Sequence, residues 1–580
     1  MRPLAASAAG LLLVVATMSA QDSPSRPLPG DRPAGNRHST RSVVMARNGM
    51  IATSQPLASA AGLRVLQDGG NAVDAAVTAA AVLAVVEPSM TGIGGDLFAL
   101  VYDGKRRTLR GLNASGRSAR SATPEAFAAK KITRMPATGV HSVTVPGVVD
   151  GWATLLKSSG TISLSRALRP AIDYAASGYA VSEIISGQWQ NSQQKLAADP
   201  TTAATFLPQG RAPRPGEVFA NPNLAATLKK IASDGSDSFY KGSIAAAIVA
   251  DMKRREGMLE ARDFAEHHSD WVEPISTTYR GHQVYELPPN TQGFLVLEML
   301  NILEGYNLTS MGHNSAEYLH LLTEAKRIAF ADRAAYLADP EAVPEPTLSM
   351  LVSKDYAAAR RRDIDPTRAA PFYAPGAVSV TRSKTTTPER AQNLTGRDRG
   401  DTIYLTVADG AGNVVSLIQS LFSDFGSGIV AGQTGVLLHN RGALFNLTPG
   451  HPDQIGPHKR PLHTLIPAFV MKDGKPWLSF GVMGGDHQAQ GHVQVLVNLI
   501  DFGMNIQEAG EAARINHGGN GLQVESAVPQ RVRSALTARG HQVSESVGAY
   551  GGFQGILIDP RSAILMGGSD PRKDGLAIGF

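Results

Sequence analysis

DTIYLTVADGAGN (residues 401–413) is followed closely by LFSDFGSGIVAGQTGVLLHN (residues 421–440), and the dipeptide Asp401-Thr402 heads the first of these two runs. A threonine hydroxyl is a weak nucleophile unless a base lies beside it. One such base is the α-amine that a threonine gains when it becomes an N-terminus, because the pKa of that amine is about 8. The dipeptide therefore predicts a proenzyme that cuts itself between Asp401 and Thr402 and then uses Thr402 as its catalytic nucleophile.

Six further blocks give this dipeptide its context, since a threonine in a run such as IYLTV is otherwise an ordinary strand residue. The blocks begin with GMIATSQPLASAAGLRVLQDGGNAVDAAVTAAAVLAVVEPSMTGIGGDLFALVY (49–102) and continue with VTVPGVVDGW (143–152), LPPNTQGFLVLEMLNILEGYNL (287–308), IGPHKRPLHTLIP (455–467), VMGGDHQAQGH (482–492) and GGSDPRKDG (567–575). In this order they resemble the γ-glutamyltransferase (glutathione hydrolase) family of N-terminal nucleophile hydrolases, from about residue 43 to the end. The resemblance implies an α/β (α+β) fold, a four-layer αββα sandwich of the N-terminal nucleophile hydrolase type, and no cofactor.

The resemblance also assigns catalytic residues around Thr402. Gly484 and Gly485 match the glycine pair whose backbone N–H groups form the family's oxyanion hole, although an isolated Gly-Gly is usually a tight turn. Ser420 falls where the family has a threonine that hydrogen-bonds the nucleophile, and the exchange keeps the hydroxyl. Thr406 falls on a serine or threonine of the family, and its alternative is a plain strand residue.

The positions that bind the amino-acid part of a γ-glutamyl group have changed. Ser115 stands at the family's carboxylate-binding arginine, Phe422 at an asparagine and Leu444 at an aspartate, and His463-Thr464 replace a pair of serines. Apolar groups at two positions that contact an ammonium leave that charge unsolvated, a penalty of several kcal/mol. We therefore expect the site to disfavour an acyl group with a free α-amine.

A carboxylate without an amine keeps candidate partners. Arg117 lies two residues from the lost arginine, and its planar fork suits a carboxylate; the alternative is a solvated surface arginine. Between Pro452 and Ile455 the chain is about ten residues shorter than relatives with a lid loop, which predicts an open pocket.

Three functions follow, of which the first is a self-processing amidase that hydrolyses or transfers γ-glutamyl-type amides such as that of glutathione. The second is a glutaryl or cephalosporin-type acylase acting on acyl amides without the α-amine. The third is a catalytically silent homologue that binds a ligand. All three involve a small molecule, and the first two require two subunits of one precursor, residues 43–401 and 402–580, whereas the third can be processed or unprocessed.

The N-terminus indicates export. Residues 1–20 (MRPLAASAAGLLLVVATMSA) have one arginine, a short apolar run and a small-residue ending, as a signal peptide does. Met18 leaves an uncleaved anchor as the alternative, because a smaller residue usually stands three before the cut. Residues 21–42 read as a disordered leader, and the protein is expected to be periplasmic or secreted, with no membrane span after signal removal.

Composition excludes several classes of protein. The 580 residues contain no cysteine, so disulfides, a cysteine nucleophile and thiolate metal sites are absent. A net charge of +5 with dispersed basic residues gives no nucleic-acid surface. His487 and His492 are five residues apart on an expected helix, which does not put both on one face, so no metal site is predicted.

Periodicity gives a coarse secondary structure. Helices are expected over 56–67, 71–86, 316–337, 491–502 and 506–514, with another closing over 301–308. Strands are expected over 98–103, 106–112 and, after Thr402, over 403–409, 412–420 and 467–482 with turns at Asp409-Gly410 and Asp473-Gly474. Residues 357–400 are polar and charged, and we expect them to form an exposed, mobile arm before the cut.

Overall fold

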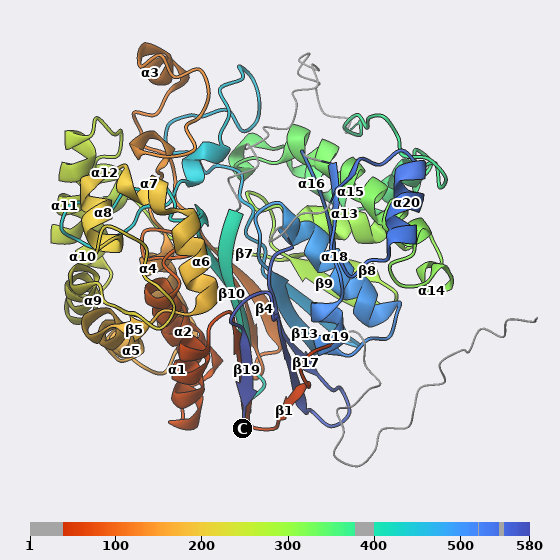
Figure 1. The fold of residues 1–580 in the computed structure, drawn as a ribbon, viewed down its shortest axis with the longest axis horizontal. Coiled ribbons are helices and arrows are strands. Elements are labelled where there is room, and N and C mark those ends of the chain that lie inside the picture. Colours follow the sequence, from red (N-terminus) through yellow and green to blue (C-terminus); the bar gives the residue numbers. More distant parts are fainter. Residues whose placement is uncertain (1–38, 378–399, 520, 545–549) are drawn as a thin grey trace, which may run out of the picture.

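Two seven-stranded sheets stack face to face in the computed structural model, which describes residues 39–377, 400–519, 521–544 and 550–580 (Figure 1). In spatial order the first sheet contains β1 (Val44–Ala46), β18 (Leu565–Ser569), β17 (Phe553–Ile558), β13 (Lys475–Val482), β12 (Ala468–Lys472), β9 (His282–Glu286) and β8 (Ile275–Tyr279). The second contains β19 (Leu576–Gly579), β2 (Gly49–Thr53), β10 (Gly400–Asp409), β11 (Val414–Ser423), β3 (Asp96–Asp103), β4 (Thr108–Ala114) and β7 (Asp270–Val272). Every paired neighbour within these two sheets is antiparallel.

Helices cover both outer faces, which confirms the expected four-layer αββα sandwich. Outside the second sheet lie α1 (Pro56–Gln67), α2 (Ala72–Val86), α4 (Val148–Ser159) and α5 (Leu164–Ser177), and outside the first lie α13 (Gly293–Leu303), α15 (Ala316–Tyr336), α17 (Lys354–Arg361), α18 (His487–Ile500) and α19 (Ile506–Glu511) (Figure 1). The alanine-rich α2 is buried along its whole length, because its small side chains let it pack against α1, α5 and the sheet at once.

The remaining elements decorate these layers. They are α3 (Pro124–Ala129), α6 (Glu183–Asn191), α7 (Gln193–Ala197), α8 (Pro200–Phe206), α9 (Pro222–Asp234), α10 (Asp237–Tyr240), α11 (Ser243–Arg254), α12 (Ala261–Ala265), α14 (Leu308–Met311), α16 (Glu345–Leu351), α20 (Gln530–Ala538), the pair β5 (Tyr179–Ala180) and β6 (Val218–Phe219), and the small sheet of β14 (Ile515–Gly518), β15 (Gly521–Val524) and β16 (Val543–Ser544).

The two predicted hairpins are present and form the centre of the sandwich. β10 and β11 pair across the Asp409-Gly410 turn, and β12 and β13 pair across Asp473 and Gly474, whose φ angles are both positive as a two-residue hairpin turn requires. β10 and β13 face each other from opposite sheets. The Thr406 hydroxyl hydrogen-bonds the Ser479 hydroxyl across this gap at 2.6 Å.

The helix boundaries differ from the predictions where caps decide them. α18 begins at His487, four residues before the predicted start, because the turn at Gly484 and Gly485 leads directly into it. α19 ends at Glu511 and not at 514, and Leu308 starts the separate helix α14 after α13 has ended at Leu303.

The prediction of a mobile arm over residues 357–400 is wrong for the first half of that segment. Residues 357–361 belong to α17, and the Tyr373 hydroxyl donates a 2.7 Å hydrogen bond to Glu324 of α15. Gly376 donates its N–H to Asp332, so residues before 378 are packed onto the helical layer. Residues 378–399 lie outside the described residues, as do the signal peptide and the leader up to residue 38. The end of the leader is hydrogen-bonded to the C-terminal part of the chain, because Arg41 donates to the Gly575 carbonyl and to Ser569.

Candidate active site

Thr402 occupies an irregular point of β10. The register against β11 runs from Asp401 opposite Phe422 to Ile403 opposite Gln419, so the ladder shifts at Thr402. Such a bulge re-aims a side chain, and bulges are frequent at active sites. Thr402 is 1% exposed, and its hydroxyl donates a 3.2 Å hydrogen bond to the Ser420 hydroxyl oxygen. The structure therefore brings the predicted nucleophile and its predicted partner together.

Ser420 also fixes the backbone beyond it. Its hydroxyl oxygen accepts a 2.7 Å hydrogen bond from the Phe422 N–H, and Phe422 has φ of +82°, a strained value for an aromatic residue. Gly95 packs directly beneath, because a Cβ there would lie 2.4 Å from the Ser420 carbonyl oxygen. The close-packed turn at residues 92–95 thus supports the strand of Ser420.

The strand that faces β10 ends just before the glycine pair. Thr406 contacts Ser479, and two residues along each strand the Tyr404 ring lies against Gly481, where a Cβ would come within 2.4 Å of it. A further step of two residues on β10 reaches Thr402. Two residues after Gly481, just past the end of β13, lies Met483, which immediately precedes Gly484 and Gly485.

Both glycines have backbone angles that other residues avoid. Gly484 has φ of +121° and Gly485 has φ of +57°, so the backbone of this turn favours glycine at both positions. Their carbonyls are engaged, since His487 N–H donates to Gly484 O and the Gln292 side chain donates to Gly485 O. In the described part of the chain neither glycine N–H donates a hydrogen bond, and both remain available as donors.

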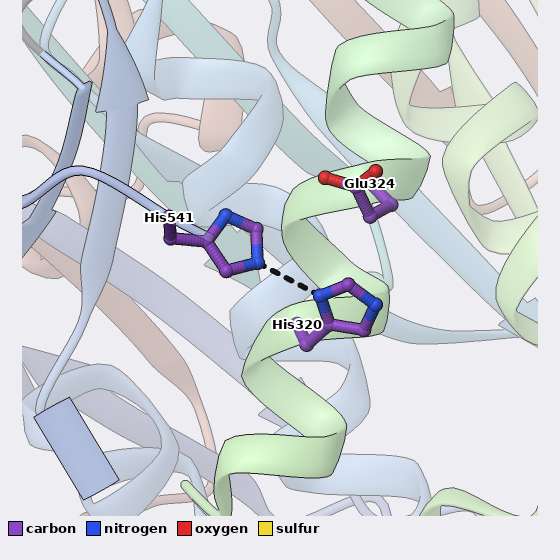
Figure 2. A group of neighbouring side chains, drawn as sticks. All are labelled: His320, Glu324 and His541. Carbon is purple, nitrogen blue, oxygen red and sulfur yellow. Dashed lines mark hydrogen bonds between the residues drawn. The ribbon is translucent and has the colours of Figure 1, made fainter. Parts of the chain in front are cut away.

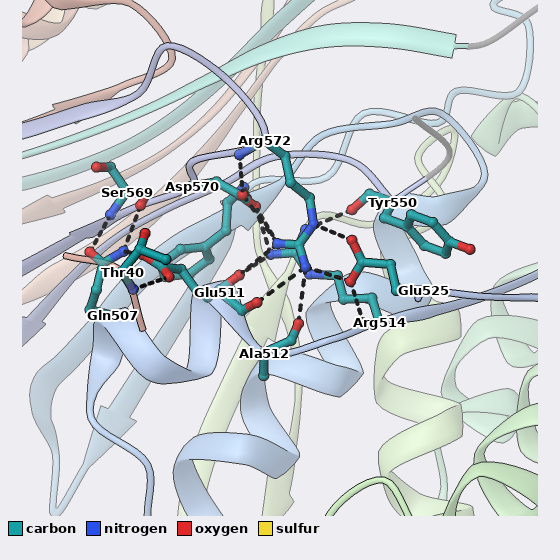
Figure 3. A network of polar contacts seen from close by, with 12 residues as sticks. Thr40, Gln507, Glu511, Ala512, Arg514, Glu525, Tyr550, Ser569, Asp570 and Arg572 are labelled. Carbon is teal, nitrogen blue, oxygen red and sulfur yellow. Dashed lines mark hydrogen bonds and ion pairs between the residues drawn. The ribbon is translucent and has the colours of Figure 1, made fainter. Parts of the chain in front are cut away.

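A buried ionic network holds the loop that packs on this turn (Figure 3). Arg514 donates to Asp570 at 2.8 Å and to the Tyr550 carbonyl at 2.6 Å, and Asp570 accepts from the Phe553 N–H. Between Tyr550 and Phe553, Gly551 lies so close to Met483 that a Cβ would be 2.1 Å from its carbonyl oxygen. Asp570, which belongs to the block 567–575, thus helps to hold the loop that packs against the glycine turn.

The residue at the lost arginine position is part of a polar cluster. The Ser115 hydroxyl donates to Asn113 Oδ1 at 2.7 Å, and Asn290 donates to Ser115 at 3.3 Å. The Ser115 carbonyl accepts from Arg460 at 3.1 Å. These contacts use the polar groups of Ser115 within the protein.

His463 is also engaged. Its Nδ1 accepts from the Leu465 N–H at 3.3 Å, so its Nε2–H donates to Asp96 at 3.1 Å. Burial, together with the nearby Arg441 charge, lowers the pKa of His463 to about 3, which makes the ring neutral. Burial opposes ionisation of Asp96, but His439 and His463 outweigh it and lower the pKa of that carboxyl, and His439 contacts the same carboxylate oxygen at 3.3 Å. Asp96 and His439 were not predicted, because the cluster joins three segments far apart in sequence.

Arg117 lies among charges. Its guanidinium is 3.9 Å from Asp270, which Arg460 also pairs with at 2.8 Å, and its side chain is 13% exposed. Burial lowers its pKa. Arg117 is thus mostly buried and is not the solvated surface arginine of the alternative. It already has an acidic neighbour in Asp270.

Arg441 was not predicted from the sequence, although it contacts two of the predicted residues. Its Nη1 donates to the Thr464 hydroxyl at 2.9 Å, and its guanidinium carbon is 4.4 Å from the centre of the Phe422 ring. Arg441 and Leu444 begin and end the single 3₁₀ turn 441–444, so they share one face. The sequence signal that could have identified Arg441 was a basic residue in the run HNRGAL, close to positions where the resemblance implies that polar groups have been replaced.

The arrangement supports acyl transfer. It combines a hydroxyl nucleophile, a hydroxyl that orients it, two glycine N–H donors in the turn after the facing strand, and a buried cation stacked on Phe422. The preceding residues Gly400 and Asp401 still pair with Ser423 and Phe422, so the structure is that of the uncut chain.

A cluster of metal-binding residue types lies elsewhere. His320, Glu324 and His541 offer ligand atoms within 4.8 Å of one another (Figure 2). The two rings hydrogen-bond each other at 2.8 Å, and His320 Nε2 donates to the Asp365 carbonyl. Glu324 accepts from Arg327 and Tyr373. Protein groups thus already satisfy this cluster. His492 is structural as well, since it accepts from the Val482 N–H and donates to Glu286.

No helix among the residues that the structure covers has both the length and the apolar character to cross a membrane.

Comparison with known proteins gives extensive similarity. The family model described as gamma-glutamyltranspeptidase matches residues 58–580. The glutathione hydrolase-like YwrD proenzyme of Bacillus subtilis (strain 168) is 39% identical over 548 residues, which cover 93% of this chain and 99% of that protein. The acylase ACY 1 proenzyme of Pseudomonas sp. (strain SE83) is 36% identical over 539 residues, covering 91% and 93%. The crystal structure of cephalosporin acylase from Bacillus halodurans aligns with a TM-score of 0.86 and 41% identity, covering 95% of this chain and 99% of that one.

Proposed function

The chain belongs to the γ-glutamyltranspeptidase family and is an N-terminal nucleophile hydrolase, and we propose that its substrates are amides whose acyl group carries no α-amine. The observation that carries the proposal is the wall beside Thr402. The side chains of Phe422 and Leu444 offer an ammonium no acceptor, and the Arg441 cation that stacks on Phe422 repels one. The names of two relatives, an acylase and a cephalosporin acylase, support the same direction.

Maturation begins in the uncut strand. Thr402 Oγ attacks the Asp401 carbonyl carbon, the peptide C–N bond breaks, and the nitrogen becomes the Thr402 α-amine while an ester forms. Water then hydrolyses the ester, which leaves the Asp401 carboxylate as one terminus and frees the Thr402 hydroxyl. The bulge and the bond to Ser420 support this step, because they hold the hydroxyl beside its own preceding peptide.

Turnover uses the same hydroxyl with its new base. The α-amine takes the hydroxyl proton, Oγ attacks the acyl carbonyl, and the oxyanion accepts hydrogen bonds from the Gly484 and Gly485 N–H groups. The proton passes to the leaving amine as the amide bond breaks. Water, deprotonated by the same α-amine, then hydrolyses the acyl ester and regenerates the enzyme.

The mature protein is proposed to be an exported heterodimer of residues 43–401 and 402–580, periplasmic or secreted. The apolar run of residues 1–20 supports export, and the proenzyme names of the relatives support two subunits. Intact mass of the purified protein tests the processing, because it should show chains ending at Asp401 and beginning at Thr402.

Side-by-side kinetics with γ-glutamyl and glutaryl 4-nitroanilides test the substrate class. Even about 1.4 kcal/mol for burying an unpartnered ammonium gives about a tenfold preference in kcat/KM for the glutaryl donor. A tenfold preference for the γ-glutamyl donor would instead identify an enzyme for glutathione-type amides. No release from any acyl anilide would identify a ligand-binding homologue.

A further inference from the structure

Arg441 is a buried cation without a carboxylate partner. The residue has no exposed surface, and within the described ranges its Nε and Nη2 have no hydrogen-bond partner. Burial lowers its pKa to about 9, which still leaves the guanidinium charged at neutral pH. An isolated buried charge costs several kcal/mol, so such a group needs an explanation in terms of what pairs with it.

The neighbouring acids are committed to other partners. Asp96 lies between His439 and His463 and accepts from the Gly116 N–H. Asp486 pairs with Arg333 at 2.6 Å, and its side chain is 61% exposed. Neither forms an ion pair with Arg441. Among the described residues, the guanidinium contacts the Phe422 ring on one face and the Thr464 hydroxyl at Nη1.

The guanidinium stacks on a residue of β11, the strand that pairs with the nucleophile's strand. Phe422, on which the guanidinium stacks, is two residues from Ser420 and pairs with Asp401 in the uncut chain. Cleavage makes Thr402 the first residue, so Gly400 and Asp401 can leave their places opposite Ser423 and Phe422. The acyl group of a substrate must then lie on this side of Thr402, next to the Arg441 wall.

We propose that Arg441 binds a terminal carboxylate of the acyl group, so that the enzyme selects monoamides of short dicarboxylic acids. A carboxylate would accept from the unused Nε and Nη2, which lie on one edge of the guanidinium as a bidentate pair requires. Thr464 and Phe422 orient the fork from the other sides. This inference rests on the proposed function and names the group that replaces the amino-acid recognition lost at Phe422 and Leu444.

The test compares glutaryl with valeryl 4-nitroanilide, which has the same number of carbons without the carboxylate. The wild type should prefer the glutaryl donor, and R441M should lower that ratio of kcat/KM by about 10- to 100-fold, mainly through KM. R441K keeps the charge without the planar fork and should fall between them. The ratio is independent of how much of each variant folds and matures. Succinyl and adipoyl anilides then give the acyl length that the site accepts.

Arg117 provides the matched comparison, since it is the rival cation on the large subunit. If R117Q collapses the ratio and R441M leaves it unchanged, the inference is overturned and Arg117 is the carboxylate partner. A wild-type measurement covers the case in which R441M fails to mature: glutarate should inhibit valeryl anilide hydrolysis at concentrations where valerate does not, and equal inhibition by both acids contradicts the inference. Hydrolysis of neither anilide contradicts the proposed function itself, whereas hydrolysis with an unchanged ratio in R441M contradicts only the role of Arg441.

Discussion

Replacing Ser420 with alanine should separate the stability of the sandwich from the chemistry of maturation. Ser420 Oγ accepts from both the Thr402 hydroxyl and the Phe422 N–H in a fully buried site. Leaving a buried amide without its acceptor costs about 1–3 kcal/mol. It also removes a contact that holds the Phe422 backbone at its positive φ, so the bulge can change shape and Thr402 can shift. A misplacement of about 1 Å at a reacting group slows chemistry about 100-fold.

The matched control is Ser416→Ala, on the same strand and facing the same side. Ser416 is equally buried and bonds the Tyr404 hydroxyl and the Ala468 carbonyl, so it should lose similar stability without touching Thr402. The amounts of precursor and cut chains, followed by intact mass, should show maturation about 100-fold slower in S420A and near normal in S416A and S420T. Urea unfolding should show both alanine variants weakened by about 1–3 kcal/mol. Maturation of S420A at the rate of S416A would refute the assignment of Ser420 as the residue that orients the nucleophile.

Thr402→Ala should stay an uncut, inactive precursor while Thr402→Ser matures, and cleavage of the alanine variant at this bond in mass spectra would point to another nucleophile. Phe422→Asn combined with Leu444→Asp should shift the ratio of glutaryl to γ-glutamyl kcat/KM towards γ-glutamyl donors, and an unchanged ratio would mean that these positions do not face the acyl group. The free energy of unfolding should fall between about pH 6.5 and pH 3, because burial lowers the pKa of His463 to about 3 and the unfolded chain takes up a proton that the folded chain does not. At pH 5 this one histidine should lower the free energy of unfolding by about 2 kcal/mol. Urea midpoints that stay constant from pH 7 to pH 5 would contradict this prediction.

Local chemistry explains what the sequence predicted well. α1 has the predicted bounds because Pro56 begins it and the Gly69-Gly70 pair follows it, and both signals act within a few residues. The strand of Thr402 follows from β-branched residues ending at an Asp-Gly turn, and the glycine pair from angles that only glycine adopts readily. Each of these features is decided by neighbours in the chain.

Long-range packing explains what the sequence could not give. The packing of residues 357–377 depends on Tyr373 reaching Glu324 and on Gly376 reaching Asp332, contacts that a polar composition conceals. The burial of Arg441 likewise depends on Phe422 and Thr464, which lie 19 residues before it and 23 residues after it. In sequence Arg441 is one basic residue among many, and only the fold leaves it without an acid.

Contact between Phe422 and Arg441 also decides how the selectivity variants must be interpreted. Phe422→Asn removes the ring under the guanidinium as well as the apolar wall, and asparagine suits the positive φ at this position better than phenylalanine does. The variant therefore relieves backbone strain, loosens the cation and adds a polar group at once. Because residues in contact couple by about 0.5–3 kcal/mol, the effects of changing Phe422 and Arg441 cannot add. The loss of the amino-acid partners and the presence of Arg441 are then two parts of one physical change, in which an aromatic ring and a guanidinium together replace recognition of an ammonium by recognition of a carboxylate.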